Sequence, residues 1–210
     1  MKFIAVIFTA MTFLMPPLAV AEENPVPPLA AVEENLILNP GFEDVGLTQN
    51  QDDARFWNEW DSKRSNLYSY NGQWALNCWG SDDSNDRGAW QGDDDGSGES
   101  QFISVSPGTR VLFSAYLMSP DTAGIGQSPL AGGVIAFLEI EWRGTKPLES
   151  VKSPCLNSTT GGSWEMYSVS GIAPQGTTSV RFVPKAISVP GSSGDVYFDE
   201  LKAVIVTDED

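Results

Sequence analysis

Short apolar runs separated by turn-forming residues are the feature of this chain that most restricts its fold. From residue 35 onward, clusters of Gly, Pro, Asn, Asp and Ser interrupt these runs every ten to fifteen residues or so, and no window of helical length has a convincing 3.6-residue period. This pattern is typical of antiparallel β structure. The candidate strands are 35–38, 56–60, 74–79, 88–91, 101–105, 110–118, 134–142, 164–172, 179–184 and 196–206.

Two of these runs alternate between side chains suited to a core and side chains suited to a surface. The sets expected to face the core are Val111, Phe113, Ala115 and Leu117 in the first run, and Ala136, Leu138, Ile140 and Trp142 in the second. The sets expected on the opposite faces are Ser114, Tyr116, Phe137, Glu139 and Glu141. About ten such strands in one domain predict an all-β fold, a two-sheet β-sandwich or jelly roll.

The first 21 residues have the features of a secretory signal peptide. Lys2 precedes an apolar run that is too short to span a bilayer, and an Ala-x-Ala cleavage site closes at Ala21. The alternative is that this apolar run forms a membrane anchor or a buried strand, but its flanking residues favour a signal peptide. We therefore expect an exported protein, secreted to the outside or held at the cell surface, with no membrane insertion.

The remainder of the chain divides by composition. Residues 22–34, rich in Pro, Ala and Glu, are expected to form a linker. Residues 35–206 have the length of one folded domain, and residues 207–210 form an acidic tail.

Charge and residue content exclude several classes of function. The formal net charge of −16 disfavours nucleic acid and anionic membranes as partners. The chain has no histidine, which excludes Ser-His-Asp, Cys-His and His-zinc mechanisms. Aromatic residues make up 10% of the chain, too many for a disordered acidic protein.

The segment 80–100 is strongly acidic and is expected to be a long surface loop. Its run of Asp93, Asp94 and Asp95, followed by Glu99, offers the hard oxygen ligands that calcium prefers. The spacing departs from an EF-hand loop, so a solvated loop is favoured over a metal site.

The two cysteines, Cys78 and Cys155, are predicted to form a disulfide, because exported chains with an even cysteine count usually pair them. Two buried free thiols are the alternative.

Four segments carry a resemblance to a known group of proteins. The segment 35–43 (NLILNPGFE) resembles the "NLLxNPGFE" opening of carbohydrate-binding modules of families four, nine and twenty-two. Segments 71–76 (NGQWAL), 105–109 (VSPGT) and 196–201 (VYFDEL) are similar to their "SGxYAL", "VxPGT" and "VxFDDV" motifs, in the same order. The resemblance implies a galactose-binding-like jelly roll.

The resemblance also implies a structural calcium ion between the terminal strands. Carried over to this chain, its ligands would be Glu43 and Asp199, completed by backbone carbonyls near Asn71 and Gly72. The alternative is that both are ordinary hydrogen-bonding carboxylates. This chain departs from the pattern at Glu200, where the family has Asp, and in an insertion at 92–100.

A polysaccharide site needs flat aromatic rings to stack on sugar faces and polar groups to bind hydroxyls. The candidate stacking rings are Trp79 and Tyr116, on predicted outward faces, and Trp90, close to the acidic loop. Asn77, Glu139 and Glu141 are the candidate hydrogen-bonding groups. Several tryptophans could instead form a satellite core, and those expected in the core are Trp57, Trp60, Trp74, Trp142 and Trp164.

The sequence therefore predicts a noncatalytic protein that binds extracellular polysaccharide or oligosaccharide. One alternative is a secreted structural or adhesion protein that keeps the jelly roll without sugar affinity. Another is a small glycoside-active enzyme that uses Glu139 and Glu141, which are two apart on a strand and so point the same way. The glycan and the oligomeric state stay open.

Overall fold

The structure is a computed structural model that describes residues 34–46, 51–79, 86–92, 102–121, 134–188 and 194–206. The predicted signal peptide, the acidic tail and all but residue 34 of the predicted linker lie outside the described residues. So do residues 80–85 and 93–100 of the predicted acidic loop.

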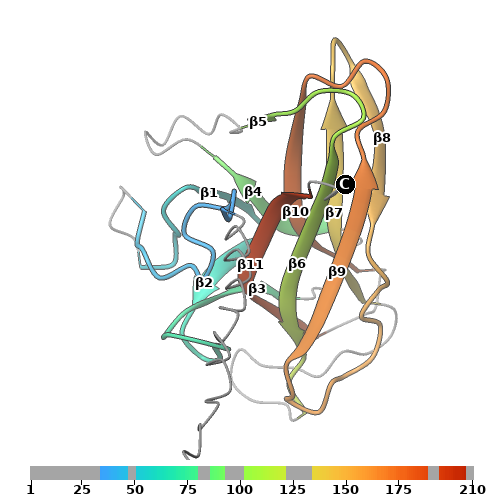
Figure 1. Cartoon of the computed structure of the whole chain (residues 1–210). Helices are drawn as coiled ribbons and strands as arrows, with labels where there is room; N and C mark the ends of the chain where they lie inside the picture. The colour runs from blue at the N-terminus through green and yellow to red at the C-terminus, as the bar shows by residue number, and fades with distance from the viewer. Residues whose placement is uncertain are drawn as a thin grey trace, which may run out of the picture. The chain divides into compact units, whose positions relative to one another are not determined.

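The described residues form eleven β-strands and no helix (Figure 1). It follows that this part of the chain contains no helix long and apolar enough to cross a membrane. The strands are β1 (Trp57–Trp60), β2 (Ser62–Ser65), β3 (Ala75–Trp79), β4 (Asp86–Gln91), β5 (Ile103–Ser104), β6 (Arg110–Met118), β7 (Ile135–Arg143), β8 (Pro147–Lys152), β9 (Glu165–Ile172), β10 (Ser179–Ile187) and β11 (Asp195–Val206).

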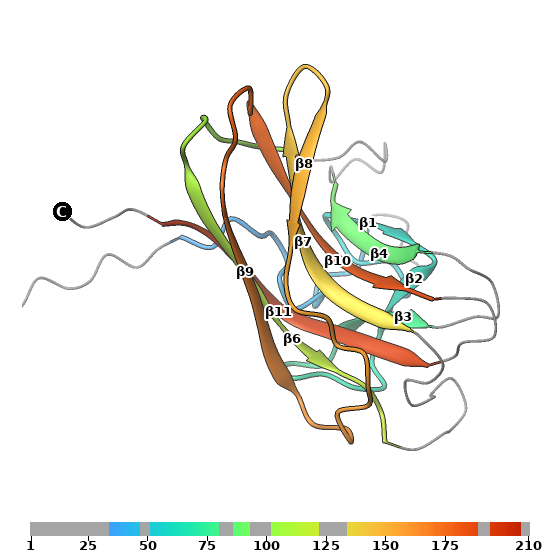
Figure 2. The ribbon, with the colours of Figure 1, turned by 90° about the vertical axis from the view of Figure 1, so that its right-hand side faces the viewer.

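The strands form two antiparallel sheets that lie face to face (Figure 2). The first sheet has the order β1-β4-β10-β7-β8, and β5 pairs with one end of β10. The second sheet has the order β2-β3-β11-β6-β9. The predicted all-β, two-sheet jelly roll is confirmed.

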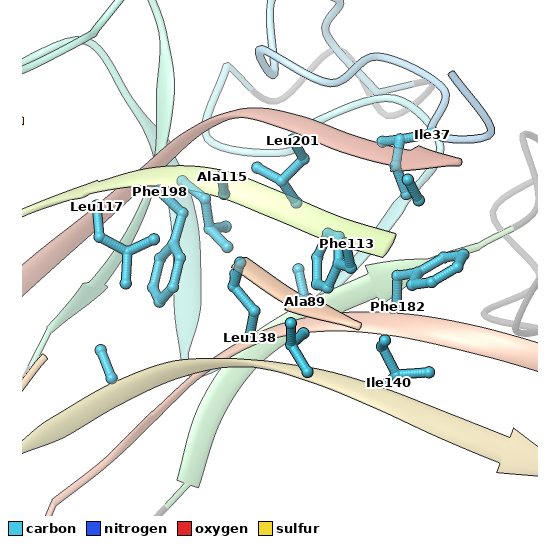
Figure 3. Packing of buried hydrophobic residues seen from close by; sticks show 14 of the residues in the cluster. Ile37, Ala89, Phe113, Ala115, Leu117, Leu138, Ile140, Phe182, Phe198 and Leu201 are labelled. Carbon is cyan, nitrogen blue, oxygen red and sulfur yellow. The ribbon is translucent and has the colours of Figure 1, made fainter. Parts of the chain in front are cut away.

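The core lies between the sheets, as Figure 3 shows. Phe113 and Leu117 of β6 and Phe198 of β11 extend from the second sheet toward Leu138 of β7 and Phe182 of β10 in the first. Both sets predicted to face inward on β6 and β7 are buried in this cluster. Burying apolar area at about 25 cal/mol per Å² is the main stabilisation of such a sandwich.

The predicted strand 110–118 coincides with β6, whereas β2 and β8 were not predicted. The sequence of β2 is Ser-Lys-Arg-Ser, without an apolar residue, and β8 begins at Pro147 on a sheet edge. Segment 35–38 is not a strand. It is held along β11 instead, where the Leu36 amide donates to the Ala203 carbonyl at 2.8 Å.

Candidate functional site

The six predicted sugar-binding residues do not share one surface. Asn77 and Trp79 of β3 and Tyr116 of β6 belong to the second sheet. Trp90 of β4 and both Glu139 and Glu141 of β7 belong to the first. The prediction of a single aromatic face is therefore wrong, because alternation along a strand assigns side chains to an inner or outer face but does not say to which sheet the strand belongs.

Segment 66–74, which connects β2 to β3, covers part of the outer face of the second sheet. The ring of Tyr70 stacks on that of Tyr116, with centroids 3.7 Å apart and planes 12° apart. Tyr68 packs edge-on against Tyr197 at 5.1 Å. Asn77 is 2% exposed, and Tyr197, its partner across β3 and β11, is fully buried.

A small second core forms under this segment. Ala75, Met118 and Tyr197 are buried together, and Tyr68 and Trp164 pack against them. Among the six predicted residues, Trp79 at the end of β3 stays open on this sheet, at 36% exposure. Tyr70, on the segment that covers part of this sheet, is open as well, at 46% exposure.

The outer face of the first sheet holds a pair of tryptophans. Trp60 and Trp90 have ring centroids 4.7 Å apart, and both are half-buried. Trp60 lies opposite Gly88 in the register of β1 and β4. A Cβ at Gly88 would lie 2.8 Å from Cη2 of Trp60, so the glycine lets this ring lie against the sheet. Trp60 was predicted to be a core residue and is instead on this outer face.

Charged side chains occupy the centre of the same face. Glu141 accepts hydrogen bonds at Oε2 from Arg143, at 2.8 Å, and from Nε of Arg181, at 2.9 Å. Glu139 accepts a hydrogen bond from the Ser150 hydroxyl. Because Arg181 is directly opposite Glu141 across β10 and β7, the register of the sheet sets this ion pair.

Two lysines complete the charge pattern around Glu139. Lys152 and Lys185 place their Nζ atoms 3.7 Å and 3.8 Å from its carboxylate oxygens. Lys185 also forms an ion pair with Asp86 at 2.8 Å. Glu139 and Glu141 are therefore both engaged by cations of the sheet, and Glu139 also by a hydroxyl.

Aromatic rings and cations alternate across this face. The guanidinium of Arg181 lies 4.8 Å from the ring centroid of Trp90 and 5.7 Å from that of Phe102. Nζ of Lys152 lies 4.8 Å from the ring centroid of Phe137. Cation–π contacts hold these rings and charges in place.

Three buried hydrogen-bond donors on this face have no partner in the protein. They are Nδ2 of Asn58, Nε1 of Trp90 and Nε of Arg143. Asn58 and Trp90 are directly opposite each other across β1 and β4. A buried donor without a partner costs about 1–3 kcal/mol, so such groups mark places where a ligand or water can bind.

The predicted calcium ligands hold a loop through backbone amides. Oε1 of Glu43 accepts hydrogen bonds from the amides of Gln73, at 2.8 Å, and Trp74, at 2.9 Å. Oδ2 of Asp199 accepts from the amides of Tyr70, at 2.7 Å, and Asn71, at 3.1 Å. Among the described residues, no group of three or more Asp, Glu, Cys or His side chains is arranged to hold a metal ion.

Glu43 and Asp199 do not by themselves complete a calcium site, because calcium requires six to eight oxygen ligands. The carboxylate oxygens of both residues accept hydrogen bonds from backbone N–H groups instead. Burial is the main reason why the pKa of Asp199 is raised to about 6. Calcium binding by Glu43 and Asp199 stays a prediction.

The predicted disulfide is contradicted, because both cysteines are free. Cys78 of β3 is fully buried between the sheets, whereas Cys155, which follows β8, is exposed. Desolvation raises the pKa of the Cys78 thiol well above its usual value.

The residues of the first-sheet face that the sequence did not single out are Trp60, Phe102, Arg143, Lys152, Arg181 and Lys185. The signal that could have found Arg181 and Lys185 is alternation in segment 179–185, where both are out of phase with Val180 and Phe182. That alternation was not used to assign an outer face.

Comparisons with known proteins bear on the fold. No family model and no curated protein matches the chain. Among solved structures, a carbohydrate-binding module of family 61 in complex with β-1,4-galactotriose is 15% identical, with a TM-score of 0.51, and the match covers 82% of this chain and 99% of the module. The family 22 xylan-binding domain from Paenibacillus barcinonensis is 13% identical, with a TM-score of 0.54 and coverage of 86% and 99%.

An arabinose-bound α-L-arabinofuranosidase is also similar, with 13% identity and a TM-score of 0.55, but the match covers only 26% of that enzyme. At these identities the likeness establishes the fold. The chain therefore has the β-sandwich jelly-roll fold of carbohydrate-binding modules.

Proposed function

We propose that this protein binds extracellular polysaccharide without catalysing its cleavage, and that the outer face of the first sheet is the binding surface. The observation that carries this proposal is the row formed by Trp60, Trp90 and Arg181, in which aromatic rings adjoin groups that can hydrogen-bond to hydroxyls. Asn58 lies next to Trp90 with a free amide donor.

The chemistry of this face suits a sugar chain. Pyranose rings have apolar C–H faces that stack on aromatic rings, and their hydroxyls bind amides, guanidinium groups and carboxylates at the edges. The side chains are held by the register of β4, β10 and β7, so little conformational entropy is lost when a ligand binds.

The second sheet is a weaker candidate. Tyr116 already has Tyr70 stacked on it, and Asn77 is buried. The similar modules named above support the carbohydrate class: one is in complex with β-1,4-galactotriose and the other is a xylan-binding domain. The engagement of Glu139 and Glu141 by cations supports a role in shaping the surface over a role as a catalytic pair.

The test is affinity electrophoresis in gels that contain soluble xylan, galactan, glucomannan or mixed-linkage β-glucan. We expect at least one polysaccharide to retard the protein, and Trp90→Ala to weaken that binding by about ten-fold or more. Trp79→Ala is the matched control, because its ring lies on the second sheet.

If Trp79→Ala abolishes retardation and Trp90→Ala leaves it unchanged, the proposed surface is wrong. If no polysaccharide, neutral or charged, retards the folded protein, the structural or adhesion alternative replaces sugar binding. If the protein releases reducing sugar from a polysaccharide that retards it in the gel, the protein is an enzyme.

A further inference from the structure

We infer that the first-sheet face prefers glycans that carry anionic groups, either uronate carboxylates or sulfate esters. This inference rests on the proposed function and names the class of its ligand. Three observations carry it: the distribution of charge, the imbalance of hydrogen-bonding groups and the placement of the rings.

The distribution of charge on this face is opposite to that of the whole chain. The chain has 12 Lys and Arg residues against 28 Asp and Glu residues. Described side chains that point outward from the first sheet include four cations and three carboxylates: Arg143, Lys152, Arg181 and Lys185, with Asp86, Glu139 and Glu141. A third of the basic residues of a strongly acidic protein are thus gathered on one sheet.

The carboxylates of this face are shared between cations. Oε2 of Glu141 is the acceptor for both Arg143 and Arg181. Lys152 reaches Glu139 only at 3.7 Å, and its side chain is 49% exposed. Arg143 and Lys152 therefore keep hydrogen-bonding capacity that an incoming anion can use.

The buried unpaired side-chain groups on the described part of this face are all donors. They are the Asn58 amide, the Trp90 indole and Nε of Arg143, and no side-chain acceptor on the described part of this face is both buried and unpaired. A neutral hydroxyl group both donates and accepts hydrogen bonds, whereas carboxylate and sulfate groups only accept them. An anionic sugar matches this surplus of donors better than a neutral one does.

The rings lie beside the cations. Phe102 is 42% exposed and lies 5.8 Å from the guanidinium of Arg143 and 5.7 Å from that of Arg181. The ring of Trp90 also lies beside the guanidinium of Arg181. A sugar stacked on either ring would bring a charged substituent within reach of an arginine.

The experiment compares two matched pairs of polymers by isothermal titration calorimetry. Polygalacturonate is compared with its methyl ester, and dextran sulfate with dextran, so that only the charge changes within each pair. The first pair tests uronate recognition and the second tests sulfate recognition. The net charge of −16 opposes nonspecific adsorption of either polyanion.

We expect the charged member of at least one pair to bind about ten-fold or more tightly than its neutral partner. Arg143→Gln and Lys152→Gln should each reduce that preference, the ratio of charged to neutral binding, by about three-fold or more. Arg110→Gln is the control, since Arg110 is an exposed arginine at the start of β6 in the second sheet. Lys152 is exposed, so its substitution preserves the fold even if that of Arg143 does not.

Equal binding of both members of each pair, together with binding of neutral glycans that depends on Trp90, would overturn this inference and leave the proposed function intact. An equal effect of Arg143→Gln, Lys152→Gln and Arg110→Gln would also overturn it. Failure to bind any glycan, charged or neutral, would overturn the proposed function itself.

Discussion

The ring of Tyr70 lies 3.7 Å from that of Tyr116 and nearly parallel to it. Tyr70 belongs to the connection between β2 and β3, and Tyr116 to the centre of β6, so the contact fixes an irregular segment onto a sheet. Its consequence is that the two outer faces of the sandwich differ: the second sheet has a covered aromatic layer, and the first carries half-buried rings and charges.

Tyr70→Ala should lower the free energy of unfolding by about 1–2 kcal/mol, because an aromatic pair and the apolar area under it are lost. Polysaccharide binding should stay within about two-fold of the unmodified protein. Urea unfolding and affinity electrophoresis measure the two quantities. If binding falls and stability does not, the second sheet is the binding surface.

Gly72→Ala should destabilise the protein more than Gly108→Ala does. Both glycines have a positive φ, of 74° and 87°, so each substitution carries a similar cost in backbone strain, about 1 kcal/mol. Only at Gly72 would the new Cβ lie 2.2 Å from Oε1 of Glu43, whereas Gly108 has open space. Thermal unfolding of both variants gives the comparison, and equal losses would show that Glu43 moves aside without cost.

The free energy of unfolding should fall as the pH rises from mildly acidic to alkaline values, because of Glu59. Burial raises the pKa of this carboxyl to about 8 in the folded state, against an ordinary value of 4.5. The folded state therefore binds the proton more tightly, so the contribution of Glu59 is fully present below pH 4.5 and is lost as pH rises through 8.

Glu59→Gln removes this titration while keeping an oxygen that can accept from the Ala54 amide. We expect the variant to match the unmodified protein at pH 5 and to exceed its free energy of unfolding at pH 9 by about 2–4 kcal/mol. Urea unfolding at both pH values is the measurement. Parallel pH profiles would contradict the raised pKa.

A thiol-reactive maleimide should label Cys155 in the folded protein and Cys78 only after unfolding. Cys155 is exposed and Cys78 is fully buried. Mass spectrometry without reductant counts the labels. An unfolded chain that takes up no label would reveal a disulfide between the two.

Glu43→Ala should lower the melting temperature equally in EDTA and in calcium chloride, since the partners of Oε1 are two backbone amides. The cost should be about 1–3 kcal/mol for the unpaired amides. A loss of stability confined to calcium-containing buffer would show that Glu43 and Asp199 bind the ion, as the resemblance implies.

The fold could be predicted because apolar and polar residues alternate along single strands, and the apolar residues form the core. Phe113 and Leu138 face the interior as their positions in β6 and β7 require. The strands β2 and β8 lacked this signal, because a polar run and a proline-led edge strand carry little apolar periodicity.

The site was only half predictable, for a different reason. Alternation put Glu139 and Glu141 on the outward face of their strand. Which outward side chains share a sheet depends on strand order, and strand order is set by contacts distant in sequence. The ring that lies on Tyr116 comes from a connecting segment that folds back over the sheet, which no local pattern reveals.

The strand β11 occupies the middle of the second sheet, between β3 and β6, although it is the last of the described strands in sequence order. While a ribosome is still producing residues 195–206, β3 and β6 have no neighbour to join them, and the amides of Tyr70 and Asn71 lack the carboxylate of Asp199. The second sheet can therefore be completed only after residues 195–206 have been synthesised.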